Sequence, residues 1–323
     1  MDMLAAAWKA ATSHFPGSGF TLIADGTKGC GRSQQSGNYQ SFLLIWGRNR
    51  DALGLIPLAQ VACRVSYVMF HLELTFCGDL PGFLRRSLRG SLMVRRNLAE
   101  KTAVKDVIEA CGIPHSEVDL IVVLDPTGAA VCSLDFPFQL DTPVSLAVYP
   151  TLAPRDVLPF APRLQARDCD RFVADGHLGA LARHLRLVGV DTAYERDASD
   201  EMLLKVMLGE NRALLTRDRR LLMHSIVRDG YCPRSDDPEE QAREMLRRFP
   251  ILDNPERISP MSRCLRCNGI LRKTPKQEVL APLAHELRTL QHYDDFLRCP
   301  DCGRIYWRGS HFKQLTARLA RIQ

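Results

Sequence analysis

Three aspartates stand where a strand-like stretch of the sequence gives way to a helix-like one. Asp175 follows a short apolar run and precedes Gly176, Asp200 begins a helical pattern, and Asp218 closes the string "LLTRD". Carboxylates that converge on one point repel one another and need a cation. Hard oxygen ligands favour Mg²⁺ or Mn²⁺ over zinc. A site of this kind holds a water in line with a phosphodiester, so the three acids predict a catalytic metal centre.

The elements that must position these acids alternate between strand and helix. Residues 169–258 predict four strands, the last of them a short one near Tyr231, and they predict helices at 177–188, 200–210, 219–227 and 238–248. Repeated strand–helix units imply a parallel sheet with right-handed crossovers. Parallel strands bring their carboxyl ends to one edge, where ligands bind. The expected fold class of this part is α/β, with helices flanking a parallel sheet.

A simpler explanation exists for each acid, because aspartate is also a preferred N-cap. Taken singly, capping and metal binding are about equally good accounts of each one. For the three together we favour the metal centre. Asp175, at the end of the first strand, is followed directly by Gly176, which predicts a turn. The third strand ends in the unusual string "LLTRD".

Four cysteines near the end of the chain have the spacing of a zinc site. They form two pairs, Cys264-x₂-Cys267 and Cys299-x₂-Cys302, and 31 residues lie between the pairs. Four thiolates in two such knuckles fit a tetrahedral structural zinc, and they leave no open coordination position for catalysis. Residues 259–323 are therefore predicted to be a zinc ribbon followed by a basic helix.

The part of the chain before the acids divides into three segments. Residues 1–66 show no sustained period and predict a poorly ordered extension, with the natural start near Met69. Residues 67–150 predict strand, strand, helix, strand, strand, with Thr102 as the helix cap, which suggests a β-grasp (α+β) domain. Residues 151–168 carry three prolines, directly after Pro150, and predict a stiff, extended linker.

The composition argues against a membrane-spanning protein and against a secreted one. No apolar run reaches the ~18 residues of a membrane span, and no signal peptide is evident. Eleven cysteines without a secretion signal favour reduced thiols or metal ligands and a cytoplasmic location. The net charge is +6, and the basic excess lies in residues 255–323, where 13 Lys and Arg stand against 6 Asp and Glu. This excess suits phosphate contacts, and solubility is the alternative explanation.

Several strings resemble a known family. "FVADGHLGALARHLRLVGVDT", "ASDEMLL", "ALLTRDRRL" and "DDPEEQ" resemble the PIN-like RNase domain first named from the C-terminal part of the Mut-seven exonuclease, over about 169–313. The resemblance implies a metal-dependent ribonuclease with Asp175, Asp200 and Asp218 as metal-binding acids. Glu201 is an alternative to Asp200. Asp236 or Asp237 is the candidate fourth acid, although "SDDPEE" also resembles an ordinary helix start.

The N-terminal domain carries its own resemblance. "GIPHSEVDLIVVLD" resembles the ubiquitin-like domain that is fused ahead of a bacterial PIN-like RNase domain. Ubiquitin-like sulfur carriers work through a free C-terminal Gly-Gly, whereas here the last strand runs on as "LAVYPTLAP". Carrier chemistry is therefore excluded for the chain as written. A structural role or the docking of a partner protein is favoured.

Two groups of residues are candidates for contacts with RNA. Arginine matches phosphate geometry, and aromatic residues beside basic ones suit unpaired bases. The alternatives are a solvated helix face and a tryptophan that packs on the zinc site. The candidates are Arg183 and Arg186 on the first helix, and Trp307, Arg308, His311 and Lys313 after the last cysteine.

The prediction from sequence is thus a cytoplasmic ribonuclease that acts on RNA with Mg²⁺ or Mn²⁺ and carries a structural Zn²⁺. The rival is a non-catalytic RNA-binding adaptor, in which the zinc ribbon binds and the PIN-like fold is a scaffold. A phosphoacceptor receiver fits poorly, because no Lys ends a late strand. The RNA substrate, endo- or exonuclease action and the oligomeric state stay open.

Overall fold

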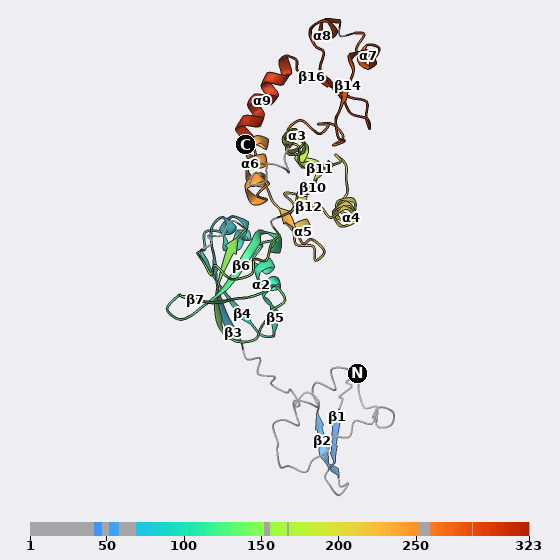
Figure 1. Ribbon diagram of the computed structural model, residues 1–323. Helices are drawn as coiled ribbons and strands as arrows, with labels where there is room; N and C mark the ends of the chain where they lie inside the picture. Colours follow the sequence, from blue (N-terminus) through green and yellow to red (C-terminus); the bar gives the residue numbers. More distant parts are fainter. Residues whose placement is uncertain are drawn as a thin grey trace. The chain divides into compact units, whose positions relative to one another are not determined.

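The computed structural model describes residues 69–151, 156–166, 168–251, 259–285 and 287–322. It also describes strands β1 (Phe42–Trp46) and β2 (Ala52–Pro57), which pair antiparallel (Figure 1). The chain divides into two compact units, Met1–Tyr67 and Val68–Gln323. The expectation of a poorly ordered extension over 1–66 otherwise falls outside the described residues.

Residues 69–151 form the predicted β-grasp domain. "FHLELTF" alternates between buried and more exposed side chains, as a strand with one covered face must. This strand, β3, pairs in parallel with β9 at the centre of a mixed five-stranded sheet of order β4-β3-β9-β6-β7. The strands are β3 (Phe70–Phe76), β4 (Met93–Leu98), β6 (Val118–Leu124), β7 (Ala130–Ser133) and β9 (Val144–Pro150).

Short elements complete this domain, and one of them corrects an expectation. Helix α2 (Val104–Ala110) packs Val104 and Ile108 into the core, but its N-cap is Ala103 and no side chain caps it. Thr102 belongs to β5 (Thr102–Ala103) and pairs with Leu140 of β8 (Gln139–Leu140), so it is not the cap. The 3₁₀ turns are η1 (Leu80–Phe83), η2 (Arg86–Leu88) and η3 (His115–Glu117).

Residues 168–251 form the predicted α/β domain. Its four strands pair only in parallel, in the order β11-β10-β12-β13. They are β10 (Arg171–Ala174), β11 (Asp191–Tyr194), β12 (Ala213–Leu215) and β13 (Gly230–Tyr231). The connecting helices are η4 (Gly176–Leu178), α3 (Gly179–Val188), α4 (Asp200–Glu210), α5 (Arg219–Leu222) and α6 (Pro238–Arg248).

The predicted helix bounds hold at α4 and α6, but α5 ends at Leu222 instead of 227. One layer of the domain's core lies between the sheet and helices α3 and α6, where Phe172 meets Phe249 with ring centroids 4.9 Å apart, and a second buried layer includes Leu203 and Met207 of α4. All three residues of β12 are buried. A parallel strand that is covered on both faces needs apolar side chains on both, which explains why β12 is a continuous apolar run.

The segment between the two domains is docked on the β-grasp domain. The Nε2 of Gln165 donates to the carbonyls of His115 and Val118, both at 2.9 Å, and its backbone amide donates to Asp119 at 3.2 Å. Gln165 is 5% exposed. Within the described residues 156–166, the proline-rich segment is therefore held by buried hydrogen bonds, which a free spacer would lack.

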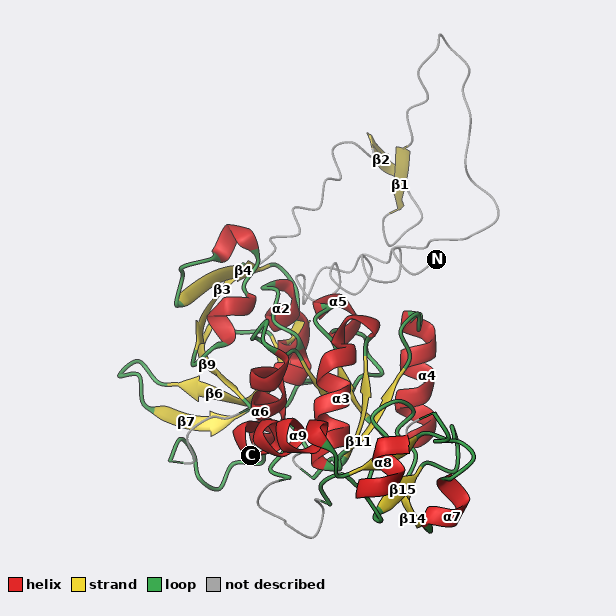
Figure 2. Ribbon diagram, turned by 90° about the horizontal axis from the view of Figure 1, so that it is seen from above, coloured by secondary structure: helices red, strands yellow, loops and turns green. Residues whose placement is uncertain are grey.

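Residues 259–307, the cysteine module, contain a three-stranded antiparallel sheet and two short helices (Figure 2). The elements are β14 (Arg272–Thr274), α7 (Lys276–Val279), α8 (Leu287–His292), β15 (Phe296–Arg298) and β16 (Ile305–Trp307). Helix α9 (Ser310–Ile322) returns to the α/β domain, where Ile322 is 1% exposed among residues of α3 and α6. No helix in the described ranges is both long and apolar enough to span a membrane.

Candidate acid site and cysteine cluster

Parallel pairing brings two of the predicted acids to one edge of the sheet. Strands β10 and β12 are neighbours, and the amide of Asp175, just past β10, donates to the carbonyl of Leu215 at 2.9 Å. The next residue, Thr216, donates its hydroxyl to Asp175 Oδ2 at 2.7 Å. The same hydroxyl accepts from the backbone amide of Asp218 at 2.9 Å. Thr216 thus links the two acid-bearing strand ends.

Thr216 itself was missed by the reasoning from sequence. It is 0% exposed, and it lies inside the string "LLTRD" that drew attention to Asp218. A buried threonine after a buried strand needs a hydrogen-bond partner, and the nearest strand end supplies it. That rule was the available signal.

The capping explanation holds for one acid of the three. Asp218 is the N-cap of α5, and its Oδ1 accepts from the amides of Arg220 (2.7 Å) and Leu221 (3.4 Å). Asp175 occupies the N-cap position of η4, but its side chain makes no capping bond. Asp200 is the first residue of α4, whose cap is Ser199, so Asp200 does not cap either.

The carboxylate oxygens of the three acids lie farther apart than the ligand atoms of a metal site. Among the described residues, the four cysteines are the only group of three or more His, Cys, Asp or Glu whose ligand atoms all lie within 4.8 Å of one another. Asp200 and Glu201 instead line a pocket between α4 and α5. The metal centre at Asp175, Asp200 and Asp218 therefore stays a prediction.

Local partners account for both candidates for a fourth acid. Asp236 is exposed and pairs with Arg217 at 2.5 Å. Asp237 is the N-cap of α6 and accepts from the amide of Glu240 at 3.2 Å. The role of Asp237 is that of an ordinary helix start, which was the alternative interpretation of "SDDPEE", and Asp236 forms an ion pair at the surface.

The candidate RNA contacts fall into different environments. Arg183 and Lys313 are exposed, as is Arg308, while the side chain of His311 lies outside the described residues. Trp307 is half-buried and packs against the small apolar core of the cysteine module, whereas the alternative interpretation had placed it on the zinc site. That core comprises Val279, Leu283, Leu290 and Phe296.

Arg186 has a structural role that the sequence pattern did not indicate. It is 2% exposed and donates to three carbonyls: Thr192 at 2.9 Å, Leu265 at 3.2 Å and Arg266 at 2.8 Å. Its burial lowers the pKa of the guanidinium. Arg186 therefore ties α3 to the first cysteine knuckle and leaves Arg183 as the accessible arginine of the pair.

The two cysteine knuckles repeat one local geometry. In each, the first cysteine donates its amide to the carbonyl five residues on: Cys264 to Gly269 at 2.8 Å and Cys299 to Arg304 at 2.9 Å. The residue after the second cysteine, Asn268 or Gly303, has φ of 73° and donates to the first cysteine's carbonyl at 2.9 Å. The repeat turns all four sulfur atoms toward one point.

Sulfur spacing fits a tetrahedral metal. The Sγ atoms of Cys264 and Cys302 are 3.6 Å apart, and those of Cys267 and Cys299 are 3.4 Å apart. A zinc–sulfur bond of about 2.3 Å implies sulfur separations of about 3.8 Å. Burial raises the pKa of the Cys264 thiol, but the Tyr306 hydroxyl, 3.2 Å from its Sγ, and nearby amides outweigh burial and lower it to about 6. The four-cysteine cluster is therefore consistent with a structural zinc.

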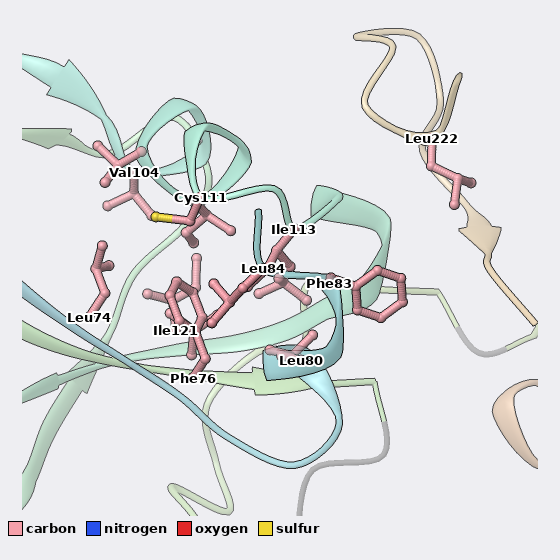
Figure 3. Packing of buried hydrophobic residues seen from close by; sticks show 14 of the residues in the cluster. Leu74, Phe76, Leu80, Phe83, Leu84, Val104, Cys111, Ile113, Ile121 and Leu222 are labelled. Atoms are coloured by element: carbon pink, nitrogen blue, oxygen red, sulfur yellow. The ribbon is translucent and has the colours of Figure 1, made fainter. Parts of the chain in front are cut away.

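The β-grasp domain contacts the element that carries Asp218. Arg219, the next residue, donates to the carbonyl of Phe83 at 2.6 Å. Leu222 of α5 belongs to the same buried cluster as Phe83 (Figure 3). His115 Nε2 lies 2.7 Å from the carbonyl of Val227. The segment that follows Asp218 is thus held from the β-grasp side.

A buried ion pair reinforces this interface. Glu117 is 0% exposed; its Oε1 accepts from the amide of Cys232 at 2.7 Å and its Oε2 from Arg234 at 2.6 Å. Arg234 also pairs with Asp79 and lies over the rings of Phe83 and Tyr231, 4.6 Å from each centroid. Glu117, Asp79 and Phe83 each lie more than a hundred positions from Arg234 along the chain, so single-sequence patterns gave no signal for these contacts.

Comparison with known proteins agrees with this architecture. Residues 170–319 match the family model of the Mut7-C RNAse domain, and residues 69–156 match that of the Mut7-C ubiquitin domain. Searches of curated proteins and of solved structures gave no match. The resemblances predicted from the sequence are confirmed: the chain combines a Mut7-C ubiquitin domain with a Mut7-C RNAse domain that includes the four-cysteine cluster.

Proposed function

We propose that this chain is a ribonuclease that hydrolyses RNA phosphodiester bonds at the edge formed by Asp175, Asp200 and Asp218. The observation that carries the proposal is the hydroxyl of Thr216, which joins Asp175 to the backbone of Asp218 inside a segment that matches the Mut7-C RNAse domain. Carboxylates placed at the carboxyl ends of neighbouring parallel strands are where this fold class holds its ligands.

The donor chemistry of this edge fits one or two Mg²⁺ or Mn²⁺ ions. Asp175 is half-buried and Asp200 and Asp218 are exposed, and all three offer the hard oxygen that these ions prefer. When bound, the ion supplies an activated water and neutralises charge on the phosphate. Thr216 fixes the orientation of the Asp175 carboxylate, and the cap bonds fix that of Asp218.

The remaining parts support this edge. The four cysteines hold a structural zinc that folds the cysteine module. Arg183, Arg308 and Lys313 are accessible cations for RNA phosphates, because all three are exposed. Trp307 contributes to the fold of the module, since it packs on the module's core.

A non-catalytic RNA-binding adaptor is the second candidate. It is favoured by the Asp218 carboxylate, which already caps α5, and by the spread of the acids beyond the 4.8 Å grouping of the cysteines. In the adaptor the parallel sheet would be a scaffold and the basic C-terminal region would bind RNA. The two candidates differ in one property, which is cleavage.

Asp175→Asn tests the proposal. The asparagine keeps the size of the side chain and an oxygen that can accept from Thr216, but it removes the charge that a cation needs. Cleavage of a labelled single-stranded RNA pool with Mg²⁺ or Mn²⁺ should fall by orders of magnitude, while filter binding of the RNA persists. Glu240→Gln is the matched control, because the ion pairs of the Glu240 carboxylate within the described residues are with Arg243 and Arg247 of its own helix α6.

Two results would count against the enzyme. Wild-type protein that binds RNA and cuts it with neither metal would favour the adaptor. Equal cutting by wild type and Asp175→Asn would remove Asp175 from the site.

A further inference from the structure

A pocket of about 570 Å³ lies between α4 and the segment from α5 to Ile226. Its apolar lining comes from Leu204, Leu208, Leu221 and Ile226. Its volume is within the range of ligand sites, which run from roughly 300 to 1,000 Å³ and combine apolar walls with a few polar groups. Leu208 is 57% exposed, so its apolar side chain is accessible to a ligand in the pocket.

The pocket is lined by the carboxylates of Asp200 and Glu201 and by basic side chains that are free to meet a ligand. Lys205 and Arg220 line it, and within the described ranges neither side chain forms an ion pair. His224 also lines it; its Nδ1 accepts from the amide of Ile226 at 3.4 Å, which leaves Nε2 available. Two free cations and an imidazole around an apolar floor match a flat base with a phosphate attached.

One wall of the pocket is fixed by the β-grasp domain. Arg219 donates to the carbonyl of Phe83, and His115 contacts the carbonyl of Val227. Leu221 is 5% exposed and Val227 1% exposed, so both ends of this wall are packed. A wall held in this way is formed before a ligand arrives, which lowers the ordering cost of binding.

The pocket adjoins the acid edge. Asp200 lines it, and Arg220, on the opposite wall, donates its amide to Asp218 Oδ1 at 2.7 Å. A nucleotide seated here places its own phosphate beside both acids.

We propose that this pocket is a base-binding subsite for one nucleotide of a single-stranded RNA, next to the phosphate that is cut. The base lies against Leu204 and Leu208, with His224 at its edge, and Lys205 and Arg220 bind the flanking phosphates. The inference rests on the proposed function for its position relative to the cut, and its test therefore reads binding separately from cleavage.

Binding of labelled RNA pentamers to the full chain tests the subsite. Pentamers of A, C, G or U are titrated by fluorescence anisotropy without added Mg²⁺ or Mn²⁺, so that no cleavage is expected. Leu208→Ala should weaken binding of the preferred pentamer roughly tenfold, because it removes the apolar surface that the base covers. Lys205→Gln should weaken all four pentamers alike, because phosphates carry no sequence.

Met202→Ala is the matched control. Met202 is also a large apolar residue of α4, 51% exposed, and it does not line the pocket. Its alanine variant should bind every pentamer as the wild type does. Thermal melting of all three variants should coincide with that of the wild type, because the three side chains are on the surface.

The outcomes separate this inference from the proposed function. Unchanged dissociation constants in Leu208→Ala and Lys205→Gln would overturn the subsite, even if the wild type cuts RNA. Weakened binding in a protein that never cuts RNA would support the subsite and overturn the nuclease.

Discussion

The cysteine cluster and the acid edge are built in opposite ways. Each cysteine pair is oriented by hydrogen bonds within six residues of chain and by one left-handed residue, Asn268 or Gly303. The acid edge joins residues more than forty positions apart through strand pairing and the hydroxyl of Thr216. It is flanked by a second domain that contacts Arg219. Each cysteine knuckle is therefore a local motif, whereas the acid edge depends on contacts across the compact unit 68–323.

Loss of zinc is expected to have the largest effect, because it removes the local site outright. Structural zinc contributes about 10 kcal/mol or more to a small module. Cys264→Ser with Cys299→Ser should abolish zinc binding and unfold residues 259–307, while the β-grasp domain stays folded. Metal analysis and limited proteolysis measure this. A protease-resistant cysteine module in zinc-free protein would contradict the prediction that zinc folds this module.

Glu117→Ala tests the dependence of the acid edge on its neighbour. The change leaves Arg234 in the interface without its buried partner, which costs about 3–5 kcal/mol for a fully buried pair. Stability should fall by an amount near the lower end of that range, since Arg234 is 26% exposed, and zinc content should be unchanged. Chemical denaturation gives the free energy of unfolding.

Glu73→Gln serves as the control for that measurement. Glu73 pairs with Arg95 on the exposed face of the same domain, where such pairs contribute about 0–1 kcal/mol. Equal losses in the two variants would show that the interface pair has no special role.

Asp218→Asn separates capping from metal binding. Asparagine caps a helix about as well as aspartate, so the free energy of unfolding should change by less than about 0.5 kcal/mol. If Asp218 holds the ion, RNA cleavage should nevertheless fall by orders of magnitude, and RNA binding should persist. Cleavage equal to that of the wild type would leave Asp218 with the cap alone.

The smallest effect is expected at the α6–α9 contact, which is sensitive to acid. Ion pairs with Arg321 and Arg318, outweighing its slight burial, lower the pKa of Glu239 from its ordinary 4.5 to about 2. The stabilisation is therefore present above about pH 4.5 and is lost as the pH falls toward 2. Glu239→Gln should cost about 1 kcal/mol at pH 7 and little at pH 2. A loss that is the same at both pH values would contradict this account.

The sequence predicted what depends on local pattern. Helices α4 and α6 were placed at their observed bounds, because a cap residue and a helical period mark them, and the cysteine spacing predicted the cluster. Arg186 was misread as a surface residue, since an arginine on a helix is usually solvated and its three carbonyl partners belong to other elements. The sequence likewise held no signal for Glu117, whose partner lies 117 positions away.

The buried pair of Glu117 and Arg234 constrains how the two domains can diverge. A lineage that loses the glutamate retains an arginine whose charge has no buried partner, so the loss is tolerated only together with a change at position 234. Across relatives that carry both domains, these two positions should therefore vary together. In relatives that carry the RNAse domain alone, position 234 should be released from this requirement. The interface thus predicts inherited coupling between residues that belong to separate family models.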